Sequence, residues 1–156
     1  MATKGAMDSG RFSFPTTFFS LVTWAGTPLF YLPIIAYVVR AAHPLSGKLI
    51  AVFLAVEVVC GGIKLAYQKQ RPIHKLAKNF LDRYNSGSFP SIHTARITSF
   101  FVITMALYHN LALAVGTGIL VLAVACSRIY LKKHYLIDVA GGFLIGALIS
   151  TGGLLI

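Results

Sequence analysis

The feature that most constrains this chain is a series of apolar runs, each close to the length that a helix needs to cross a lipid bilayer. That length is about 20 residues. Five runs reach or approach it, at about 18–39, 49–67, 92–108, 111–131 and 136–156. Because backbone groups in lipid must be hydrogen-bonded within the protein, and the runs are too long for barrel strands, they predict helices. The expected fold class is all-α, a polytopic transmembrane bundle of about five spans.

The composition supports a membrane location. Hydrophobic residues make up 56% of the chain and charged residues only 12%, which is about half the ~25% of soluble domains. These values exclude a disordered chain, a basic nucleic-acid-binding domain and an ordinary cytosolic enzyme. The 156 residues suit one membrane domain, residues 1–156, that begins with a polar segment at 1–17. We expect a multi-pass integral protein of the cell membrane.

The charges are few but one-sided, with 14 Lys and Arg residues against 4 Asp and Glu residues and a formal net charge of +10. The basic residues interrupt apolar runs instead of covering a surface, so anionic lipids or a phosphorylated substrate explain them better than nucleic acid does. The expected partners are therefore the bilayer and a membrane lipid substrate, and no nucleic acid. The sequence does not determine the oligomeric state.

Small residues and prolines predict how individual spans bend and pack. Gly26, Pro28 and Pro33 are expected to bend the first span. Gly142, Gly146 and Ser150 recur at four-residue intervals in the last span. That spacing lets neighbouring backbones approach closely, and we interpret it as helix packing only.

The longest polar interval, residues 72–90, lies between the second and third spans. Its apolar residues fall on one helical face, which fits a short helix lying on the membrane surface over the site. A solvated loop is the alternative. The apolar residues of this face are Leu76, Phe80, Leu81 and Tyr84, and the basic residues of the segment include Lys75, Lys78 and Arg83.

Polar residues gather at one end of the predicted bundle. Alternating helices bring the ends of the second and fourth spans to the same side as the starts of the third and fifth. These four ends hold the segments 64–71, 127–128, 91–93 and 134–138. Ionisable residues inside spans are costly and usually functional, so the sequence predicts a functional site there.

The spacings within these segments carry chemical meaning. Lys64 and Arg71 are two helical turns apart and share a face. Ser91 is the expected N-cap of the third span, whose free N–H groups form an anion site. His134 and Asp138 form an i, i+4 pair, in which the carboxylate can accept a hydrogen bond from one imidazole nitrogen. The other nitrogen is then free to attack an electrophile.

Three ordered blocks of the chain resemble the three-part signature of type 2 phosphatidic acid phosphatases, the PAP2 superfamily. They are Lys64-x6-Arg71-Pro72, Pro90-Ser91-Ile92-His93 and Ser127-Arg128-x5-His134-x3-Asp138. A lone His-x3-Asp pair is a weak signal, but three blocks in order with these internal spacings are specific. The resemblance covers residues 64–138, and the flanking apolar helices fit the membrane lipid phosphatase branch.

The resemblance implies a role for each residue of the blocks. His134 would be the nucleophile that forms a phosphohistidine, Asp138 would orient it, and His93 would be the general acid. The phosphoryl oxygens would be held by Lys64, Arg71, Ser91, the backbone N–H of Ile92, and Arg128. Three cations around three oxygens supply the charge stabilisation that phosphoryl transfer needs. The resemblance therefore implies no cofactor and no metal.

One position departs from the family pattern, because Ile92 stands where the second block usually has Gly. A β-branched residue resists positive φ, so this turn is expected to use an ordinary backbone conformation. The N–H that would contact the phosphoryl group is retained. The change leaves the turn geometry and the substrate fit open, and an inactive relative is an alternative.

Two further ionisable residues lie near the predicted site. Glu57 precedes Lys64 by two turns on the same face, and it either pairs with a cation, senses the lipid, or stays a neutral hydrogen-bonded acid. Arg96 lies one turn into the third span, and it either reaches the phosphate or extends to lipid headgroups. Both are possible accessory site residues.

The resemblance implies a metal-independent hydrolase acting on a lipid phosphate or diphosphate. Polyprenyl diphosphate, phosphatidate and phosphatidylglycerol phosphate are the candidates, and no sequence feature ranks them. A lipid phosphotransferase with the same histidine chemistry is one alternative, and a non-catalytic anion- or lipid-binding membrane protein is another. The combination of His93, His134 and Asp138 favours an enzyme, since a binder needs only cations.

The side of the membrane that carries the site remains open. Besides the cations of the site, nine basic residues lie at its end of the bundle and two at the other end. The positive-inside rule therefore favours a cytoplasmic site, whereas bacterial members of the resembling family generally have an outward-facing one. The nine are Lys4, Arg11, Lys69, Lys75, Lys78, Arg83, Arg96, Lys132 and Lys133, and the two are Arg40 and Lys48.

Overall fold

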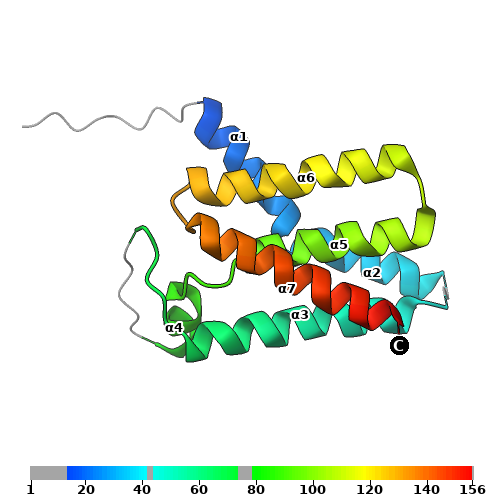
Figure 1. The fold of residues 1–156 in the computed structure, drawn as a ribbon, viewed down its shortest axis with the longest axis horizontal. Helices are drawn as coiled ribbons and strands as arrows, with labels where there is room; N and C mark the ends of the chain where they lie inside the picture. Colours follow the sequence, from blue (N-terminus) through cyan, green and yellow to red (C-terminus); the bar gives the residue numbers. More distant parts are fainter. Residues whose placement is uncertain (1–13, 42–43, 74–78, 156) are drawn as a thin grey trace, which may run out of the picture.

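The computed structural model describes residues 14–41, 44–73 and 79–155, and the described part is helical (Figure 1). Its elements in chain order are α1 (Phe14–Val22), the 3-10 helix η1 (Thr23–Gly26), α2 (Pro28–Arg40), α3 (Ser46–Ala66), α4 (Phe80–Ser86), α5 (Ile92–Tyr108), α6 (Leu111–Tyr130) and α7 (Leu136–Leu155). The all-α prediction is confirmed, with helices at each of the five expected spans.

Four stretches are long and apolar enough to cross a membrane: Phe14–Arg40, Ser46–Ala66, Leu111–Tyr130 and Leu136–Leu155. The fifth expected span, α5, is apolar but has only 17 residues. Its length of about 26 Å is slightly below the ~30 Å of a hydrocarbon core. The first span is broken, as expected, where η1 ends at Gly26 and α2 begins at Pro28. This break places η1 against the start of α5. Pro33 lies inside α2, which continues through it to Arg40.

Helix α5 is the centre of the bundle and packs against α3, α6, α7 and η1 (Figure 1). Its contact with α7 is the closest, because two glycines of α7 face its backbone. A Cβ atom added to Gly142 or Gly146 would lie 2.3 Å from the carbonyl oxygen of Ser91 or Ala95. The Ser99 hydroxyl also donates to the Gly146 carbonyl at 3.2 Å. The prediction that this spacing serves helix packing is therefore confirmed.

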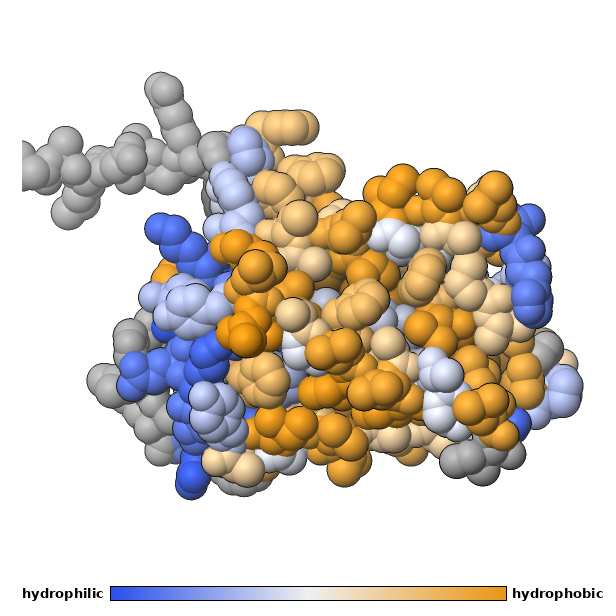
Figure 2. Space-filling model, in the orientation of Figure 1, coloured by the Kyte–Doolittle hydropathy of each residue, from blue (hydrophilic) through white to orange (hydrophobic). Residues whose placement is uncertain are grey.

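The hydrophilic residues lie toward the two ends of the molecule, with a broad hydrophobic band between them (Figure 2). At one end α3 and α6 finish, α5 and α7 begin, and α4 lies beside the end of α3 (Figure 1). This arrangement is the one expected from alternating spans. It brings segments that are up to 74 residues apart in sequence to the same end of the bundle.

A short helix occurs within the 72–90 interval, but it is shorter than the expected amphipathic face. Helix α4 covers Phe80–Ser86. Its Tyr84 is half-buried and packs in a core cluster with Val56, Cys60 and Ile92, so it contacts protein. Lys75, Leu76 and Lys78 lie outside the described residues, as do the side chains of Phe80 and Leu81.

Candidate active site

The structure brings the predicted site residues together at the end of the bundle where α4 lies. Seven of them are almost fully buried. The fractional exposures are 1% for Lys64, 0% for Ser91, 7% for Ile92, 6% for Arg96, 6% for Arg128, 2% for His134 and 0% for Asp138. Arg71 and His93 are half-buried. Charged groups with so little access to water require nearby partners of opposite charge or a ligand.

Two of the cations converge on one carbonyl oxygen, that of Gly87 in the segment after α4. Lys64 Nζ donates to it at 2.7 Å, and Arg71 Nε and Nη2 lie at 3.4 Å from the same atom. Burial lowers the pKa of the Arg71 guanidinium, and the negative charge of Asp138 opposes that shift. The segment that precedes α5 thus holds both cations in place.

The third cation approaches from α6. Arg128 Nη1 donates to the Thr23 hydroxyl of η1 at 2.7 Å, and its Nε is buried without a hydrogen-bond partner among the described residues. Among the described residues, no ion pair joins Lys64, Arg71 or Arg128 to a carboxylate. Three positive charges without acidic partners make this end of the bundle suited to a polyanion such as phosphate.

His134 is held as a neutral imidazole with a defined tautomer. Its Nδ1 lies 2.7 Å from the carbonyl oxygen of Ser88. A carbonyl only accepts hydrogen bonds, so Nδ1 carries the proton and Nε2 keeps a lone pair. Burial lowers the pKa of His134 well below its usual value, and the positive charges of Arg128 and Lys64 lower it further. The ring is therefore neutral at neutral pH, with a free lone pair on Nε2.

Asp138 contacts the ring less directly than the i, i+4 spacing suggests. Its Oδ2 lies 3.9 Å from His134 Nδ1, beyond hydrogen-bond distance. That oxygen instead accepts from the Ser88 hydroxyl and, at 2.8 Å, from the Tyr135 N–H. The physical reason is that the carboxylate satisfies a free N–H at the start of α7, as in a capping box. It therefore holds Ser88, and the Ser88 carbonyl holds the ring.

The second Asp138 oxygen has its own partner, Lys69. Its Nζ lies 2.5 Å from Asp138 Oδ1, with side-chain exposures of 24% and 0% respectively. The Lys69 carbonyl accepts the Ser88 N–H at 2.7 Å. Lys69, in the segment after α3, is thereby joined both to Asp138 on α7 and to Ser88 in the segment before α5.

His93 lies in the first turn of α5. Its Nδ1 is buried and has no hydrogen-bond partner. Lys64, Arg71 and Arg128 are close enough to act electrostatically on both the His93 and the His134 rings. With two imidazoles beside the same three cations, one ring can attack an electrophile while the other transfers a proton. Among the described residues, no group of three His, Cys, Asp and Glu side chains gathers as a metal site.

The turn before α5 has the backbone that Ile92 requires. The only described non-glycine residues with positive φ are His109 and Lys132, so the expected ordinary conformation at Ile92 is confirmed. Its side chain is 7% exposed and belongs to the core cluster of Val56 and Cys60, while its N–H lies at the helix start, where no intrahelical acceptor exists. Ser91 occupies the N-cap position, but its hydroxyl accepts from the Thr94 hydroxyl instead of capping the helix.

Glu57 and Arg96 pair with each other. Arg96 Nε donates to one carboxylate oxygen and Nη2 donates to the other at 2.8 Å, and Nη1 donates to the Gly26 carbonyl at 3.0 Å. Of the alternatives for Glu57, the structure shows the pairing with a cation. Arg96 is 6% exposed, so it does not extend to headgroups, and its guanidinium is occupied by Glu57 and Gly26.

Sequence reasoning missed four contributors to this site: Thr23, Lys69, Gly87 and Ser88. Gly87 contributes only a backbone carbonyl, which no side-chain motif reveals. Ser88 and Thr23 act through contacts with residues 50 and 105 positions away. Lys69 lies between Lys64 and Arg71 in the sequence. This position beside two predicted site cations is the one sequence signal that could have assigned it to the site.

Comparisons with known proteins identify the family and agree with the fold. A sequence model described as the PAP2 superfamily matches residues 45–156, and no curated protein matches the chain. The crystal structure of Aquifex aeolicus LpxE is similar at a TM-score of 0.78 and 21% identity, over 94% of this chain and 88% of that one. That of a transmembrane PAP2-type phosphatidylglycerolphosphate phosphatase from Bacillus subtilis is similar at a TM-score of 0.76 and 23% identity, over 92% and 77%.

Proposed function

Because the chain belongs to the PAP2 superfamily, we propose that it is an integral membrane phosphatase that removes phosphate from a lipid phosphate or diphosphate. The reaction proceeds through a phosphohistidine on His134. The observation that carries this proposal is the state of that ring, which is buried and held through Nδ1 by the Ser88 carbonyl. It lies beside three cations that form no ion pair with a carboxylate of the described residues. A site that only bound anions would need no such nucleophile.

In the first step the lone pair on His134 Nε2 attacks phosphorus, and the bond from phosphorus to the leaving oxygen breaks. The substrate binds as its monoanion and passes its proton to His93, which donates that proton to the leaving oxygen, so the lipid leaves as an alcohol or a monophosphate. Lys64, Arg71 and Arg128 stabilise the charge on the non-bridging oxygens, with the Ile92 N–H as a further donor. The buried cations offset the negative charge that the substrate brings.

In the second step water attacks the phosphohistidine. His93, now neutral, accepts a proton from that water as the nitrogen–phosphorus bond breaks. Inorganic phosphate is released together with that proton, and His134 returns to its neutral form. Each of the two rings ends the cycle in the protonation state in which it began.

A lipid is the favoured substrate because the site lies at one end of an apolar bundle with four helices long enough to cross a bilayer. The name of the Bacillus subtilis neighbour describes a phosphatidylglycerolphosphate phosphatase, which supports a lipid phosphate. Polyprenyl diphosphate, phosphatidate and phosphatidylglycerol phosphate are therefore the substrates to compare.

The test is a phosphate-release assay in detergent across these three lipids, with His134→Ala and His93→Ala beside the wild type. We expect His134→Ala to abolish turnover. His93→Ala should slow it by about 10²–10⁴-fold, and most for substrates with poor leaving groups, because those need the proton. Chelator should leave the rate unchanged, since the cations supply the charge stabilisation. Wild-type turnover by His134→Ala would overturn the mechanism.

A further inference from the structure

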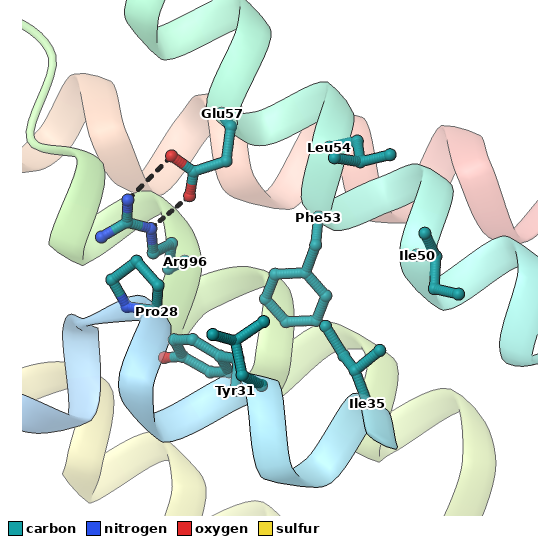
Figure 3. Close-up of a pocket in the computed structure, with 9 residues that line it drawn as sticks. Pro28, Tyr31, Ile35, Ile50, Phe53, Leu54, Glu57 and Arg96 are labelled. Carbon is teal, nitrogen blue, oxygen red and sulfur yellow. Dashed lines mark hydrogen bonds and ion pairs between the residues drawn. The ribbon is translucent and has the colours of Figure 1, made fainter. Parts of the chain in front are cut away.

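An ion pair inside the bundle joins Glu57 of α3 to Arg96 of α5, beside Tyr31 of α2 (Figure 3). Glu57 precedes the site residue Lys64 by two helical turns, so the pair lies within the spans. Ionisable residues within spans are costly and usually functional. A buried ion pair is also weak evidence for stability, because apolar residues of similar size often replace it without loss. The pair therefore points to a role other than stability.

The pair fixes the direction of the one remaining arm of the Arg96 guanidinium. Arg96 donates from Nε and from Nη2 to the two oxygens of Glu57, the second bond being 2.8 Å long (Figure 3). Two bonds to one carboxylate fix the plane of a guanidinium. Nη1 is thereby directed at the Gly26 carbonyl, to which it donates at 3.0 Å. Glu57 thus acts on η1 through Arg96.

Gly26 lies directly against the side chain of His93. A Cβ atom at Gly26 would be 2.7 Å from His93 Cβ and 3.0 Å from its Cδ2. The His134 ring is held by a hydrogen bond from Nδ1 to the Ser88 carbonyl, but His93 Nδ1 is buried without a hydrogen-bond partner among the described residues. Packing against Gly26 therefore takes the place of such a bond in limiting how the His93 ring turns.

Helix η1 depends on its neighbours for its position. It has only four residues, and 3-10 helices have poor hydrogen-bond geometry of their own. The Thr23 hydroxyl at its start accepts from Arg128 Nη1 at 2.7 Å, and the Ala25 carbonyl accepts from the Tyr31 hydroxyl. One end of η1 thus contacts a cation of the site, and the other end, at Gly26, contacts the expected general acid.

From these contacts we propose that Glu57 and Arg96 are positioning residues for His93, an inference that rests on the proposed function. Through the Gly26 carbonyl they hold η1 against the His93 side chain and so set the direction in which this ring delivers its proton. In this role neither residue touches the substrate. Loss of the pair should therefore impair proton transfer to the leaving oxygen and spare the attack by His134.

The dependence of the rate on the leaving group separates this role from a general loss of structure. A lipid phosphate releases an alkoxide-like oxygen, which needs the proton from His93, whereas an aryl phosphate monoester releases a stabilised phenolate that does not. The quantity to compare is kcat/KM, because it excludes the hydrolysis of the phosphohistidine that both substrates share. The ratio of the lipid value to the aryl value then measures the general acid alone.

The central variant is Arg96→Lys, with Ser99→Ala as its matched control. Lysine keeps the charge beside Glu57 but has no planar fork to reach the Gly26 carbonyl as well. Ser99 lies on the same helix and also donates to a backbone carbonyl, that of Gly146 on α7 at 3.2 Å. Thermal unfolding in detergent checks that both variants are folded.

We expect Arg96→Lys to lower kcat/KM for the lipid phosphate by roughly 10-fold, a part of the ~10²–10⁴-fold that a general acid contributes, and to leave the aryl value within about twofold. Glu57→Gln should lower the ratio in the same direction, and Ser99→Ala should leave it unchanged. An unchanged ratio in Arg96→Lys, or an equal fall in the ratio in Ser99→Ala, overturns the proposal.

A double-mutant cycle tests whether the effect passes through His93. In a His93→Ala background Arg96→Lys should cause no further loss of lipid turnover, because the group that it positions is absent. Losses that multiply in the double variant would show that Arg96 acts on another part of the site, and would overturn the proposal.

A spectroscopic measurement separates failure of this inference from failure of the proposed function. Nitrogen-15 spectra of labelled histidine, with the resonance assigned from the His93→Ala variant, should show a shift of the His93 signal in Arg96→Lys and none in Ser99→Ala. An unmoved His93 signal in Arg96→Lys overturns the inference even if the wild type hydrolyses lipid phosphates. If the wild type releases no phosphate from any lipid, the proposed function fails, and the spectra still report whether the pair holds the ring.

Discussion

At the scale of single residues, the reactivity of this site depends on how three side chains and one carbonyl share their hydrogen bonds. Asp138 accepts from Lys69, Ser88 and the Tyr135 N–H, and its Oδ2 lies 3.9 Å from His134 Nδ1, beyond hydrogen-bond distance. The ring is held by the Ser88 carbonyl instead. Ser88 therefore connects the carboxylate to the His134 ring, and Lys69 neutralises a carboxylate that has no access to water.

The tautomer and charge of His134 can be measured directly. Since burial and the nearby cations lower its pKa below the usual ~6.5, the ring should stay neutral, with the proton on Nδ1, down to below pH 6 in the ligand-free protein. Nitrogen-15 spectra of labelled histidine in detergent report both properties, and the His134→Ala spectrum assigns the resonance. A ring that titrates near pH 6.5, or that carries its proton on Nε2, would contradict the geometry.

The role of Lys69 predicts a specific kinetic defect. Lys69→Met removes the partner of the Asp138 carboxylate, so the Ser88 turn is held less firmly, and kcat should fall by roughly 10-fold (about 1.4 kcal/mol of barrier). KM should change little, because Lys69 is not placed among the phosphate-holding cations. Lys69→Arg keeps the charge and should recover most of the rate. Equal loss in both variants, or a change confined to KM, would argue against this role.

At the scale of elements, the site depends on how closely α5 and α7 pack. The N–H of Ser91 donates to the Asp138 carbonyl at 2.8 Å, and the Gly142 backbone lies against the Ser91 carbonyl. The starts of the two helices are thus fixed to one another. This contact sets the position of His93 on α5 relative to Asp138 on α7, so helix packing and site geometry are linked.

Two glycines of α7 allow a matched test of this packing. A methyl group at Gly146 would meet the Ala95 backbone at 2.3 Å, whereas nothing lies within 4 Å of a Cβ at Gly152. Gly146→Ala should therefore destabilise the protein by about 1–3 kcal/mol, with partial loss of activity. Gly152→Ala should be neutral or stabilising, because alanine favours a helix. Thermal unfolding in detergent measures both, and equal melting temperatures would refute the packing argument.

At the scale of the whole molecule, the charge asymmetry between the two ends predicts orientation. Arg96 is buried and paired with Glu57, so it does not count among the cations that face lipid headgroups. The remaining basic residues are still more numerous at the end that carries the site than at the opposite end. The positive-inside rule then favours a cytoplasmic active end. That orientation would make the substrate a lipid of the inner leaflet.

Cysteine labelling in intact cells decides the orientation. In a variant with Cys60 and Cys126 replaced, a cysteine at exposed Asn85 reports the active end and one at exposed His109 reports the opposite end. We expect a membrane-impermeant maleimide to label the His109→Cys variant and to spare Asn85→Cys until the cells are opened. The reverse pattern would place the site outside.

The sequence by itself determined the helical class, the positions of the spans and the end of the bundle at which the polar residues meet. These properties follow from the length and composition of apolar runs, because lipid forces each run to satisfy its own backbone and alternation then fixes which ends coincide. The ordinary backbone at Ile92 was predictable for a similarly local reason, the steric limit on a β-branched residue.

Only the tertiary structure decided the contacts between segments far apart in the chain. Ser88 meets Asp138, Lys69 meets the same carboxylate, and Arg128 reaches Thr23 across 105 positions. Periodicity cannot reveal such contacts, because a hydrogen bond depends on the relative depth and rotation of two helices to within an ångström. An i, i+4 spacing permits the bond between His134 and Asp138, but competition from the N–H and hydroxyl groups around the carboxylate decides which bond forms.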